Sequence, residues 1–420
     1  MKVLELFAGV GGFRIGLENA DKDFFETKWA NQWEPSRQSQ DAFEVYNYHF
    51  PDSQNINISI SDITDEEFSK MDADMIVGGF PCQDYSVARS KKNEQGIEGK
   101  KGVLFWEIIR ATRIIQPKYL ILENVDRLLK APSKQRGRDF AIMLTAFNNL
   151  GYSVEWRVIN AAEYGRSQRR RRVFFFVYRN DTEFAKQIDE QFENTELVFE
   201  DTKYDDYIFN SGLFATQFPI KPIPVKNRHV FYELAEDIVE VSDNFTGTVW
   251  NTGIMRHGKY YSIDTESNYD GKPITLGEIL QDESDVPEKY FLTDPAKLKK
   301  FQSLRGPKKI ERTSADGHTY IYSEGGMSPY DDLNLPGRTM LTSEGTVNRS
   351  THFLFVNNRY RLITPIEAER LQDFPDDWTA KKQLADGSVV DVSDKMRMFF
   401  MGNALVTEIV KEIGNFIKIL

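Results

Sequence analysis

The sequence contains a single cysteine, Cys82, among its 420 residues. One thiol cannot form a disulfide within the chain, and it cannot build a cysteine-based zinc site. A lone cysteine is most often a small buried apolar residue, so its presence alone indicates no chemistry. Any role for Cys82 must therefore be argued from its neighbours.

Long apolar segments are also missing. Residues 1–9 are apolar apart from Lys2 and Glu5, and they end in glycine. This stretch is too short for a membrane helix and lacks the layout of a secretory signal. No other stretch approaches 18 uncharged apolar residues. We therefore expect a cytoplasmic protein, and the length of 420 residues favours two domains.

The chain has no excess of basic residues, since its formal net charge is -11. An acidic chain is a poor match for nucleic acid, because phosphates are neutralised by Lys and Arg. The charge is segregated, however. Residues 181–206 hold ten acidic residues and two lysines, whereas residues 297–312 hold seven basic residues and one acid. We interpret 181–206 as a solvated linker, and net charge alone excludes no partner.

Internal repeats are absent, and the first 180 residues instead alternate short apolar runs with mixed segments. Residues 13–17 begin a predicted helix, and 104–115 have helical spacing. Four runs are predicted strands: 2–7, 75–77, 119–122 and 173–177. This alternation predicts a doubly wound, mainly parallel α/β sheet of Rossmann-like type, with ligands at the carboxyl ends of the strands.

The pattern changes near residue 180. From 207 to about 350 the alternation is lost, and Gly, Pro, Asn and Asp punctuate short aromatic and β-branched runs. We predict a second, smaller, mostly irregular β-rich domain there. Regular pattern returns at Thr364, where Pro365 and Glu367 complete a helix start. Residues 405–420 predict an amphipathic helix.

A glycine-rich turn, Phe7-x-Gly9-x-Gly11, follows the first predicted strand. A strand that leads through such a turn into a helix commonly holds a nucleotide-like group. Arg14 stands where the dinucleotide pattern needs its third glycine, which favours an adenosine without a pyrophosphate, such as S-adenosylmethionine. A plain tight turn fits these residues about as well.

Cys82 lies just past the predicted strand 75–77, and Pro81 fixes the backbone before it. Nearby positive charge favours the thiolate, which is the reactive form of cysteine. A solvated loop beside an inert cysteine is the alternative. The basic residues that follow, interleaved with glycines, are Arg89, Lys91, Lys92, Lys100 and Lys101.

An acid and a run of arginines flank two other predicted strands. Glu123 follows the strand 119–122, although a helix cap or a surface acid fits equally. Five arginines fall within residues 166–172, and strand alternation puts Arg170 and Arg172 on one side. Such guanidiniums can bind phosphate or stabilise a negatively charged intermediate. A solvated basic patch explains only some of the five.

In this order and spacing, the motifs resemble those of the DNA (cytosine-5)-methyltransferase family, of the bacterial or phage modification type. The resemblance implies an S-adenosylmethionine-dependent methyltransferase fold with a mixed sheet. It implies a catalytic and cofactor-binding domain in 1–180, a linker and target-recognition domain in 181–357, and a segment 358–420 that completes the first domain. The matching elements are Phe7-x-Gly9-x-Gly11, Pro81-Cys82-Gln83, Glu123-Asn124-Val125, Gln168-x-Arg170-x-Arg172 and Gly402-Asn403.

By this resemblance, Cys82 adds to carbon 6 of a cytosine flipped out of duplex DNA, and carbon 5 receives the methyl group of S-adenosylmethionine. Glu123 contacts ring N3, while Arg172 and Arg170 anchor the base and the thiol loop. Covalent addition divides one hard step into two easier ones. Flipping the base costs about a few kcal/mol. The family further implies a monomer without metal, which protects DNA beside a restriction nuclease that it does not contact.

The resemblance also assigns binding residues. Relatives often carry an acid just before the adenine-stacking tryptophan, whereas here Gln32 precedes Trp33 and Glu34 follows it, so the ribose contact stays open. The DNA-contacting residues are Gln83, Ser86, Arg89, Gln168 and Thr339. The cofactor-lining residues are Phe7, Gly9, Gly11, Trp33, Glu34, Asp62, Ile63, Pro81, Leu104, Asn403 and Leu405.

Thr339 belongs to the segment 338–342, which resembles a Thr-Leu recognition element, although a simple core strand fits equally. Three basic segments, namely the thiol loop, the arginine run and residues 297–312, are predicted to face one cleft and clamp the DNA. The recognised base sequence cannot be inferred from these residues.

Three alternatives stay open. An RNA cytosine-5 methyltransferase shares this framework, but its eukaryotic tRNA-modifying branch carries a Cys-Phe-Thr element that needs a second cysteine. An exocyclic-amine methyltransferase would have an Asp/Asn-Pro-Pro-Tyr/Phe loop where this chain has Phe80-Pro81-Cys82-Gln83. The third alternative is a catalytically silent DNA-binding relative.

Overall fold

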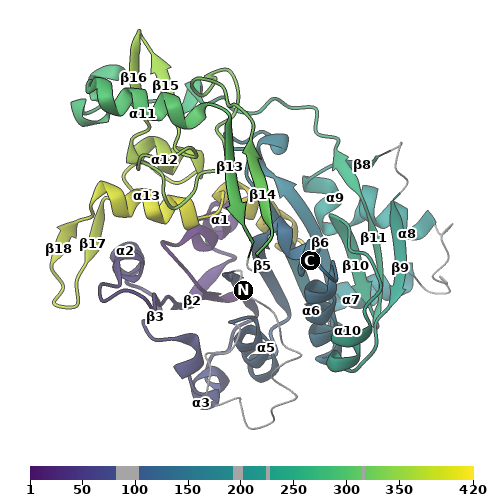
Figure 1. Cartoon of the computed structure of the whole chain (residues 1–420). Helices are drawn as coiled ribbons and strands as arrows, with labels where there is room; N and C mark the ends of the chain where they lie inside the picture. Colours follow the sequence, from purple (N-terminus) through teal and green to yellow (C-terminus); the bar gives the residue numbers. More distant parts are fainter. Residues whose placement is uncertain (82–103, 193–201, 224–227, 315–316) are drawn as a thin grey trace.

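The computed structural model describes residues 1–81, 104–192, 202–223, 228–314 and 317–420. Within these residues a ten-stranded mixed sheet runs through the molecule in the order β3-β2-β1-β4-β5-β7-β6-β10-β11-β9 (Figure 1). One hydrophobic cluster lies on each face of this sheet. The predicted α/β fold with a mixed sheet is confirmed.

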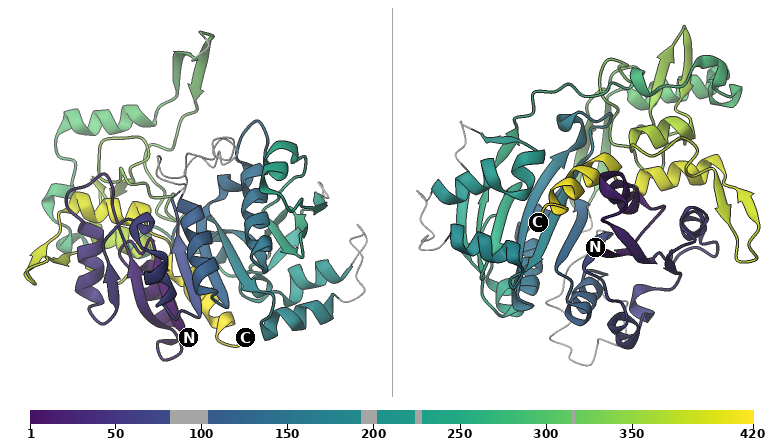
Figure 2. Two further views of the ribbon diagram at one scale, coloured as in Figure 1. Left: turned by 90° about the horizontal axis from the view of Figure 1, so that it is seen from below. Right: turned by 180° about the vertical axis from the view of Figure 1, so that it is seen from behind.

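The first half of the sheet is parallel. Its strands are β3 (Gln54–Ile56), β2 (Glu26–Asn31), β1 (Lys2–Leu6), β4 (Met75–Gly79) and β5 (Tyr119–Val125). Parallel pairing brings the carboxyl ends of these strands to one edge. Figure 2 (left) shows the N-terminus, where β1 begins, at one end of the molecule, so this edge faces the opposite end.

The second half of the sheet is antiparallel. It contains β7 (Arg171–Arg179), β6 (Tyr152–Asn160), β10 (Thr252–Arg256), β11 (Lys259–Ile263) and β9 (His229–Glu233). Three of these strands come from the segment predicted to be a separate domain, so the sheet continues past the boundary drawn at residue 181. Antiparallel neighbours need no crossover helix. The strand–helix alternation used to find the sheet therefore stops before the sheet does.

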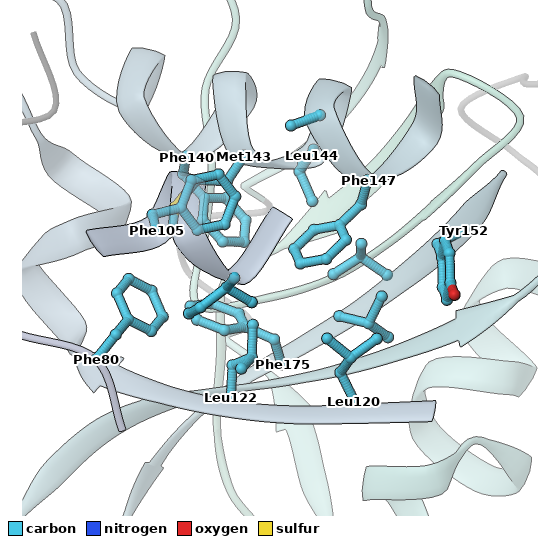
Figure 3. Packing of buried hydrophobic residues seen from close by; sticks show 14 of the residues in the cluster. Phe80, Phe105, Leu120, Leu122, Phe140, Met143, Leu144, Phe147, Tyr152 and Phe175 are labelled. Atoms are coloured by element: carbon cyan, nitrogen blue, oxygen red, sulfur yellow. The ribbon is translucent and has the colours of Figure 1, made fainter. Parts of the chain in front are cut away.

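One face of the sheet is covered by α3 (Asp65–Ser69), α5 (Leu104–Ile115), α6 (Arg138–Asn149) and α10 (Ile238–Asn244). Figure 3 shows aromatic side chains of this layer, such as Phe140 and Phe147, lying over leucines of β5 and Phe175 of β7. Phe80 is part of the same cluster, with 3 % of its surface exposed. The chain that leads toward Cys82 therefore starts from the core.

The other face is covered by α1 (Gly12–Asp21), α7 (Glu183–Gln191), α9 (Leu213–Gln217) and α14 (Thr407–Ile417). The C-terminal helix α14 packs directly on α1. A Cβ atom added to Gly16 of α1 would lie 2.5 Å from Cβ of Val410, so only glycine permits this approach. The end of the chain thus returns to the first helix, beside the glycine-rich turn.

The remaining elements lie around the sheet. The helices are α2 (Asp41–His49), α8 (Thr202–Asp206), α11 (Pro295–Arg305), α12 (Pro365–Leu371) and α13 (Asp394–Asn403). The two-stranded pairs are β8 (Ile220–Pro222) with β12 (Thr265–Ser267), β13 (Lys308–Thr313) with β14 (Thr319–Glu324), β15 (Phe353–Val356) with β16 (Arg359–Leu362), and β17 (Lys381–Gln383) with β18 (Val389–Asp391). We call residues 268–362 the outer region. Among the described residues, every helix is too short or too polar to span a bilayer.

Candidate active site

The predicted acid and one predicted arginine meet at the end of β5. Val125 of β5 pairs with Arg172 of the antiparallel β7, which puts Glu123 and Arg172 on one face as diagonal neighbours. Nε of Arg172 lies 3.0 Å from Oε1 of Glu123. The two side chains are 17 % and 12 % exposed, so the pair is largely buried but still reachable by a small ring.

Burial raises the pKa of Glu123 above its ordinary value, and Arg172 followed by Arg170 opposes this shift. The carboxyl group is thus more readily protonated than an exposed glutamate, and the neutral acid can donate a hydrogen bond to a ring nitrogen. Gly79 of β4 leaves space beside the carboxyl group of Glu123. Any side chain there would crowd this group, because its Cβ atom would lie 3.1 Å from Oε2 of Glu123.

Asn124 holds the segment that leads to Cys82. Its Nδ2 donates to the carbonyl oxygen of Phe80 at 2.9 Å, and the Phe80 ring lies 6.0 Å from the ring of Phe105. Pro81 is exposed. Cys82 and three predicted DNA contacts, Gln83, Ser86 and Arg89, lie outside the described residues.

Arg170 joins three parts of the chain. Its guanidinium is buried and donates to the carbonyl oxygens of Met340 at 3.0 Å, Gly402 at 3.0 Å and Ala404 at 2.7 Å. Burial, together with the neighbouring charge of Arg172, lowers the pKa of Arg170 to about 9. Strand β7 is thereby tied to the segment 338–342 and to the end of α13.

The other arginines of the run differ from one another. Arg166 makes two hydrogen bonds to the carboxylate of Asp373, at 2.8 and 2.7 Å. Arg171 is exposed and pairs with Asp126 at 3.2 Å, while Arg169 is also exposed. A solvated basic patch therefore describes Arg169 and Arg171 only.

Gln168 was predicted to contact DNA, but its side chain is fully buried. Its Nε2 donates to the carbonyl oxygen of Leu371 at 2.8 Å, and its Oε1 accepts from the backbone N–H of Met340 at 2.9 Å. In this structure Gln168 positions the segment 338–342 and does not face solvent. Nearby, Thr339 is half-buried and donates to the carbonyl oxygen of Arg169 at 2.5 Å.

The segment 338–342 is irregular, with a single bridge between Gln168 and Gly337 at its start. The core-strand interpretation of this segment is therefore wrong. The structure holds the segment against residues 168–170, directly before β7.

The glycine-rich turn has left-handed backbone at Phe7 (φ 53°), Gly9 (φ 54°) and Gly11 (φ 95°). At Gly11 a Cβ atom would lie 2.6 Å from the ring of Phe50, so glycine is required there. At Gly9 a Cβ atom would meet no described atom within 4 Å. This side of the turn therefore opens onto free space.

Strand β2 ends beside the turn. Oε1 of the buried Gln32 accepts the backbone N–H of Gly9 at 2.8 Å, so this oxygen is committed to the turn. Trp33 is 39 % exposed. Glu34 is half-buried, and burial raises the pKa of its carboxyl group against the opposing charge of Arg37.

The C-terminal segment closes over the same turn. Nε1 of Trp378 donates to the carbonyl oxygen of Val10 at 2.8 Å. The side chain of Leu405 would lie 3.4 Å from a Cβ atom on Gly12. The other predicted cofactor residues are exposed (Asp62, Asn403), half-buried (Leu104) or buried (Ile63).

Three contributors to the site were not singled out from the sequence: Gly79, Asp373 and Trp378. Gly79 stands in the Gly78-Gly79 pair before Cys82, which was a usable signal. Asp373 and Trp378 act on partners 207 and 368 residues away, and no local pattern announces such contacts. Among the described residues, no group of three or more His, Cys, Asp or Glu side chains could hold a metal ion.

Comparisons with known proteins agree with this site. The family described as C-5 cytosine-specific DNA methylase matches residues 1–418. Type II methyltransferase M.Sau3AI of Staphylococcus aureus is 54 % identical over 418 residues, covering 100 % of this chain and 95 % of that protein. Type II methyltransferase M.HhaI of Haemophilus parahaemolyticus is 34 % identical over 182 residues, covering 43 % of this chain and 50 % of that protein.

Among solved structures, that of a Spodoptera frugiperda DNMT2 mutant covers 99 % of both chains with a TM-score of 0.57. Its sequence identity of 14 % shows a shared fold alone. The family match over nearly the whole length, with the ordered motifs at one sheet edge, excludes the exocyclic-amine alternative. The chain belongs to the C-5 cytosine-specific DNA methylase family and is, as its motifs predict, a DNA (cytosine-5)-methyltransferase.

Proposed function

We propose that this protein transfers a methyl group from S-adenosylmethionine to carbon 5 of a cytosine flipped out of duplex DNA, with Cys82 as the nucleophile. The observation that carries the proposal is the Glu123–Arg172 pair at the carboxyl edge of β5. It stands one strand from the Phe80–Pro81 segment that precedes Cys82.

The glycine-rich turn fits this cofactor. The space beside Gly9 can admit a ligand, and the exposed ring of Trp33 offers a face for adenine. We assign the ribose hydroxyls to Glu34, because the side-chain oxygen of Gln32 is already bonded to the turn. When bound, S-adenosylmethionine supplies an electrophilic methyl group and leaves as S-adenosylhomocysteine. The other lining residues in this proposal are Phe7, Gly11, Asp62, Ile63, Pro81, Leu104, Asn403 and Leu405.

The protein's own groups then act on the base. The thiolate of Cys82 forms a bond to carbon 6, which pushes electron density into the ring and makes carbon 5 nucleophilic. Glu123 hydrogen-bonds ring N3 and stabilises that density, and the raised pKa of its carboxyl group suits a proton donor. Arg172 orients Glu123. Loss of the carbon-5 proton expels Cys82 and restores the ring.

The biological setting follows from the relatives. M.Sau3AI is a Type II methyltransferase, which supports a role in a restriction–modification system. We propose that the protein acts as a monomer on double-stranded DNA in the cytoplasm of a bacterial or phage-infected cell. A cognate nuclease would share its target sequence without binding the protein.

Mass spectrometry of nucleosides tests the reaction. Duplex plasmid DNA incubated with the protein and S-adenosylmethionine is expected to yield 5-methylcytosine. Methyl groups found only on adenine or on cytosine N4 would overturn the proposal. A parallel reaction with tRNA separates DNA from RNA activity, and a silent relative would methylate neither. Sequencing the methylated plasmid would identify the target sequence.

Covalent trapping tests the nucleophile. The wild-type protein is expected to form a denaturation-resistant adduct with 5-fluorocytosine DNA, and Cys82→Ala is expected to form none. Unchanged binding of S-adenosylmethionine by Cys82→Ala would show that this variant is folded. An adduct that survives the substitution refutes the assignment, since the chain has no other cysteine.

A further inference from the structure

The hairpin β13–β14 projects from the body of the molecule. Figure 2 (left) shows it extending at the end opposite both chain termini, which is the side where the parallel strands end. Five of the six residues of β13 are exposed and the sixth is half-buried, while four of the six in β14 are exposed. A two-stranded hairpin on its own is marginally stable in water. Its exposure therefore indicates a surface that another molecule covers.

The charge on this part of the chain is strongly positive. Residues 297–312 span α11 and β13 and hold seven basic residues against one acid, in a chain of net charge -11. Among the seven, Arg305 forms an ion pair with Asp331 in the described residues, and Lys308 stands opposite Glu324 in the hairpin ladder without an ion pair at contact distance. Unpaired positive charge on an exposed projection is complementary to a polyanion. The six basic residues outside any ion pair in the described residues are Lys297, Lys299, Lys300, Lys308, Lys309 and Arg312.

Apolar side chains gather on the same projection. Three of the fourteen exposed large hydrophobic side chains of the described residues lie on the hairpin, and four more lie between 330 and 347. On the hairpin, Ile310 is 41 %, Tyr320 is 43 % and Ile321 is 68 % exposed. The guanidinium of Arg312 lies 4.0 Å above the ring of Tyr322, so charge and aromatic surface are interleaved. Exposed apolar groups of this kind mark interaction sites.

We propose that residues 295–314 and 317–324, the arm, bind the DNA duplex outside the flipped cytosine. The lysines and Arg312 neutralise phosphates, while Ile310 and Tyr320, which share one face of the hairpin, contact base edges. A two-stranded ribbon fits the major groove, where apolar side chains can touch thymine methyl groups. Duplex DNA fits better than an acidic protein because a major groove offers phosphates and apolar methyls together. The inference rests on the proposed function and extends it to the specific contacts of the arm.

The root of the arm is held firmly. Arg305, at the end of α11, is buried and donates to the carboxylate of Asp331 at 2.7 Å and to the carbonyl oxygen of Thr351 at 3.2 Å. Arg349 binds the carboxylate of Glu324, at the end of β14, at 2.7 Å. The buried Arg305 contacts and the half-buried Arg349–Glu324 pair fix the arm relative to the rest of the outer region. The arm can therefore meet DNA in one register.

Salt dependence of binding tests the phosphate contacts. The probe is a short labelled duplex containing a cytosine that the wild-type protein methylates. Lys308→Gln/Lys309→Gln/Arg312→Gln is expected to reduce the slope of log affinity against log salt by about 0.9 for each lost contact. Its KM for DNA is expected to rise about tenfold or more, with a smaller change in kcat. A salt slope and a KM equal to those of the wild type would overturn the proposal that the arm binds DNA.

A matched variant controls for charge. Lys22→Gln/Lys70→Gln/Lys186→Gln removes the same charge from exposed positions outside the arm and is expected to keep the wild-type slope. Equal losses in both triple variants would reduce the effect to net charge and overturn the inference. Unchanged melting temperatures would show that both variants are folded.

A second variant tests the apolar contacts. Ile310→Ala/Tyr320→Ala is expected to keep the salt slope but to bind the methylated-site duplex about tenfold more weakly, since these two side chains share one face of the hairpin and such contacts read bases. Sedimentation of the free protein tests whether a second copy of the chain covers the arm instead of DNA. If the wild type is a dimer, and the arm variants dissociate it without changing DNA affinity, the arm binds a second copy of the chain. That result would overturn the proposal that the arm binds DNA. Absence of 5-methylcytosine with the wild type would instead refute the proposed function.

Discussion

The carboxyl edge of the sheet and the outer region hold their functional side chains by different means. At the edge, Glu123 and Arg172 are set by the ladder between β5 and β7, most of whose residues are apolar and buried. In the outer region one hydrophobic cluster has only four buried members, and buried ion pairs to Asp331 fix the arm and the segment 338–342. Catalytic geometry thus depends on strand register, and recognition geometry depends on a few charged contacts.

The two regions also bury carboxylates differently. Glu155 of β6 forms no ion pair among the described residues, and its Oε2 accepts from the hydroxyl of Tyr207 at 2.8 Å. Burial raises the pKa of Glu155 to about 7, against that hydrogen bond. Burial would also raise the pKa of Asp331, but Arg338, His352 and Arg305 together lower it well below its usual range. The sheet thus favours the neutral form of the buried acid at Glu155, away from its Glu123–Arg172 pair, whereas the outer region pairs its buried acid at Asp331 with arginines.

The largest expected effect is on the sheet edge. Glu123→Gln keeps the shape of the side chain but removes its proton, so kcat is expected to fall about a hundredfold or more. The melting temperature should stay close to that of the wild type, because the surrounding strands are unchanged. Single-turnover methylation measures the loss. Glu163→Gln, at an exposed glutamate, is the matched control, and full turnover by Glu123→Gln would remove Glu123 from the chemistry.

The next effect separates the two regions. Asp331→Asn leaves the buried Arg305 and the half-buried Arg338 without their counter-charge, which costs about 3–5 kcal/mol. The outer region is expected to become sensitive to proteases and the KM for DNA to rise, while S-adenosylmethionine binding is retained. Limited proteolysis and calorimetry measure the two readouts. Asp332→Asn, at the exposed neighbour, is the control. Proteolysis unchanged from the wild type would mean that apolar packing holds this region.

The sequence predicts the sheet edge well because its signals are local. The glycine-rich turn and the motifs at Cys82 and Glu123 lie at or just past the end of a buried strand, and the arginine motif leads directly into one, so order and spacing suffice. The predicted helix 104–115 coincides with α5, and the capping box of Thr364 with Glu367 is present at the start of α12. Local hydrophobic period and capping chemistry decide such elements without help from distant residues.

The sequence does not predict contacts that depend on distant partners. Gln168 was assigned to DNA, yet its partners Leu371 and Met340 are 203 and 172 residues away. The charge cluster around Asp331 was not foreseen either, since Arg305 lies 26 residues before it. Strands β9 to β11 were not assigned to the sheet because each has only five residues, and only the seven-residue helix α10 lies between them, so no strand–helix alternation is visible.

A smaller effect tests the unpaired acid of the sheet. The ordinary pKa of a glutamate is 4.5 and that of folded Glu155 is about 7, so the folded protein binds the extra proton between these values. The free energy of unfolding is therefore expected to fall as pH rises from 4.5 to about 7. Above about pH 7 the whole of this loss is present. Glu155→Gln should raise the free energy of unfolding by up to about 3 kcal/mol above neutral pH, and by little near the lower limit.

Denaturant unfolding at both ends of this pH range measures the difference. Glu5, whose pKa burial also raises to about 7, remains in the variant, so part of the pH dependence will persist. A variant that loses stability equally at both pH values would show that Glu155 acts as a charged hydrogen-bond acceptor. In that case the sheet would bury charge as the outer region does.

The smallest effect concerns neighbours within β7. Arg171 forms an ion pair with Asp126, and its side chain is 51 % exposed. Exposed ion pairs contribute about 0–1 kcal/mol to the free energy of unfolding. Arg171→Gln is therefore expected to change unfolding by less than about 1 kcal/mol and to leave turnover within about twofold. Arg172→Gln, one residue along, removes the charge beside Glu123 and should lower turnover about tenfold or more. Equal turnover in the two variants would show that strand register does not select the catalytic arginine, because alternation is the difference between these positions.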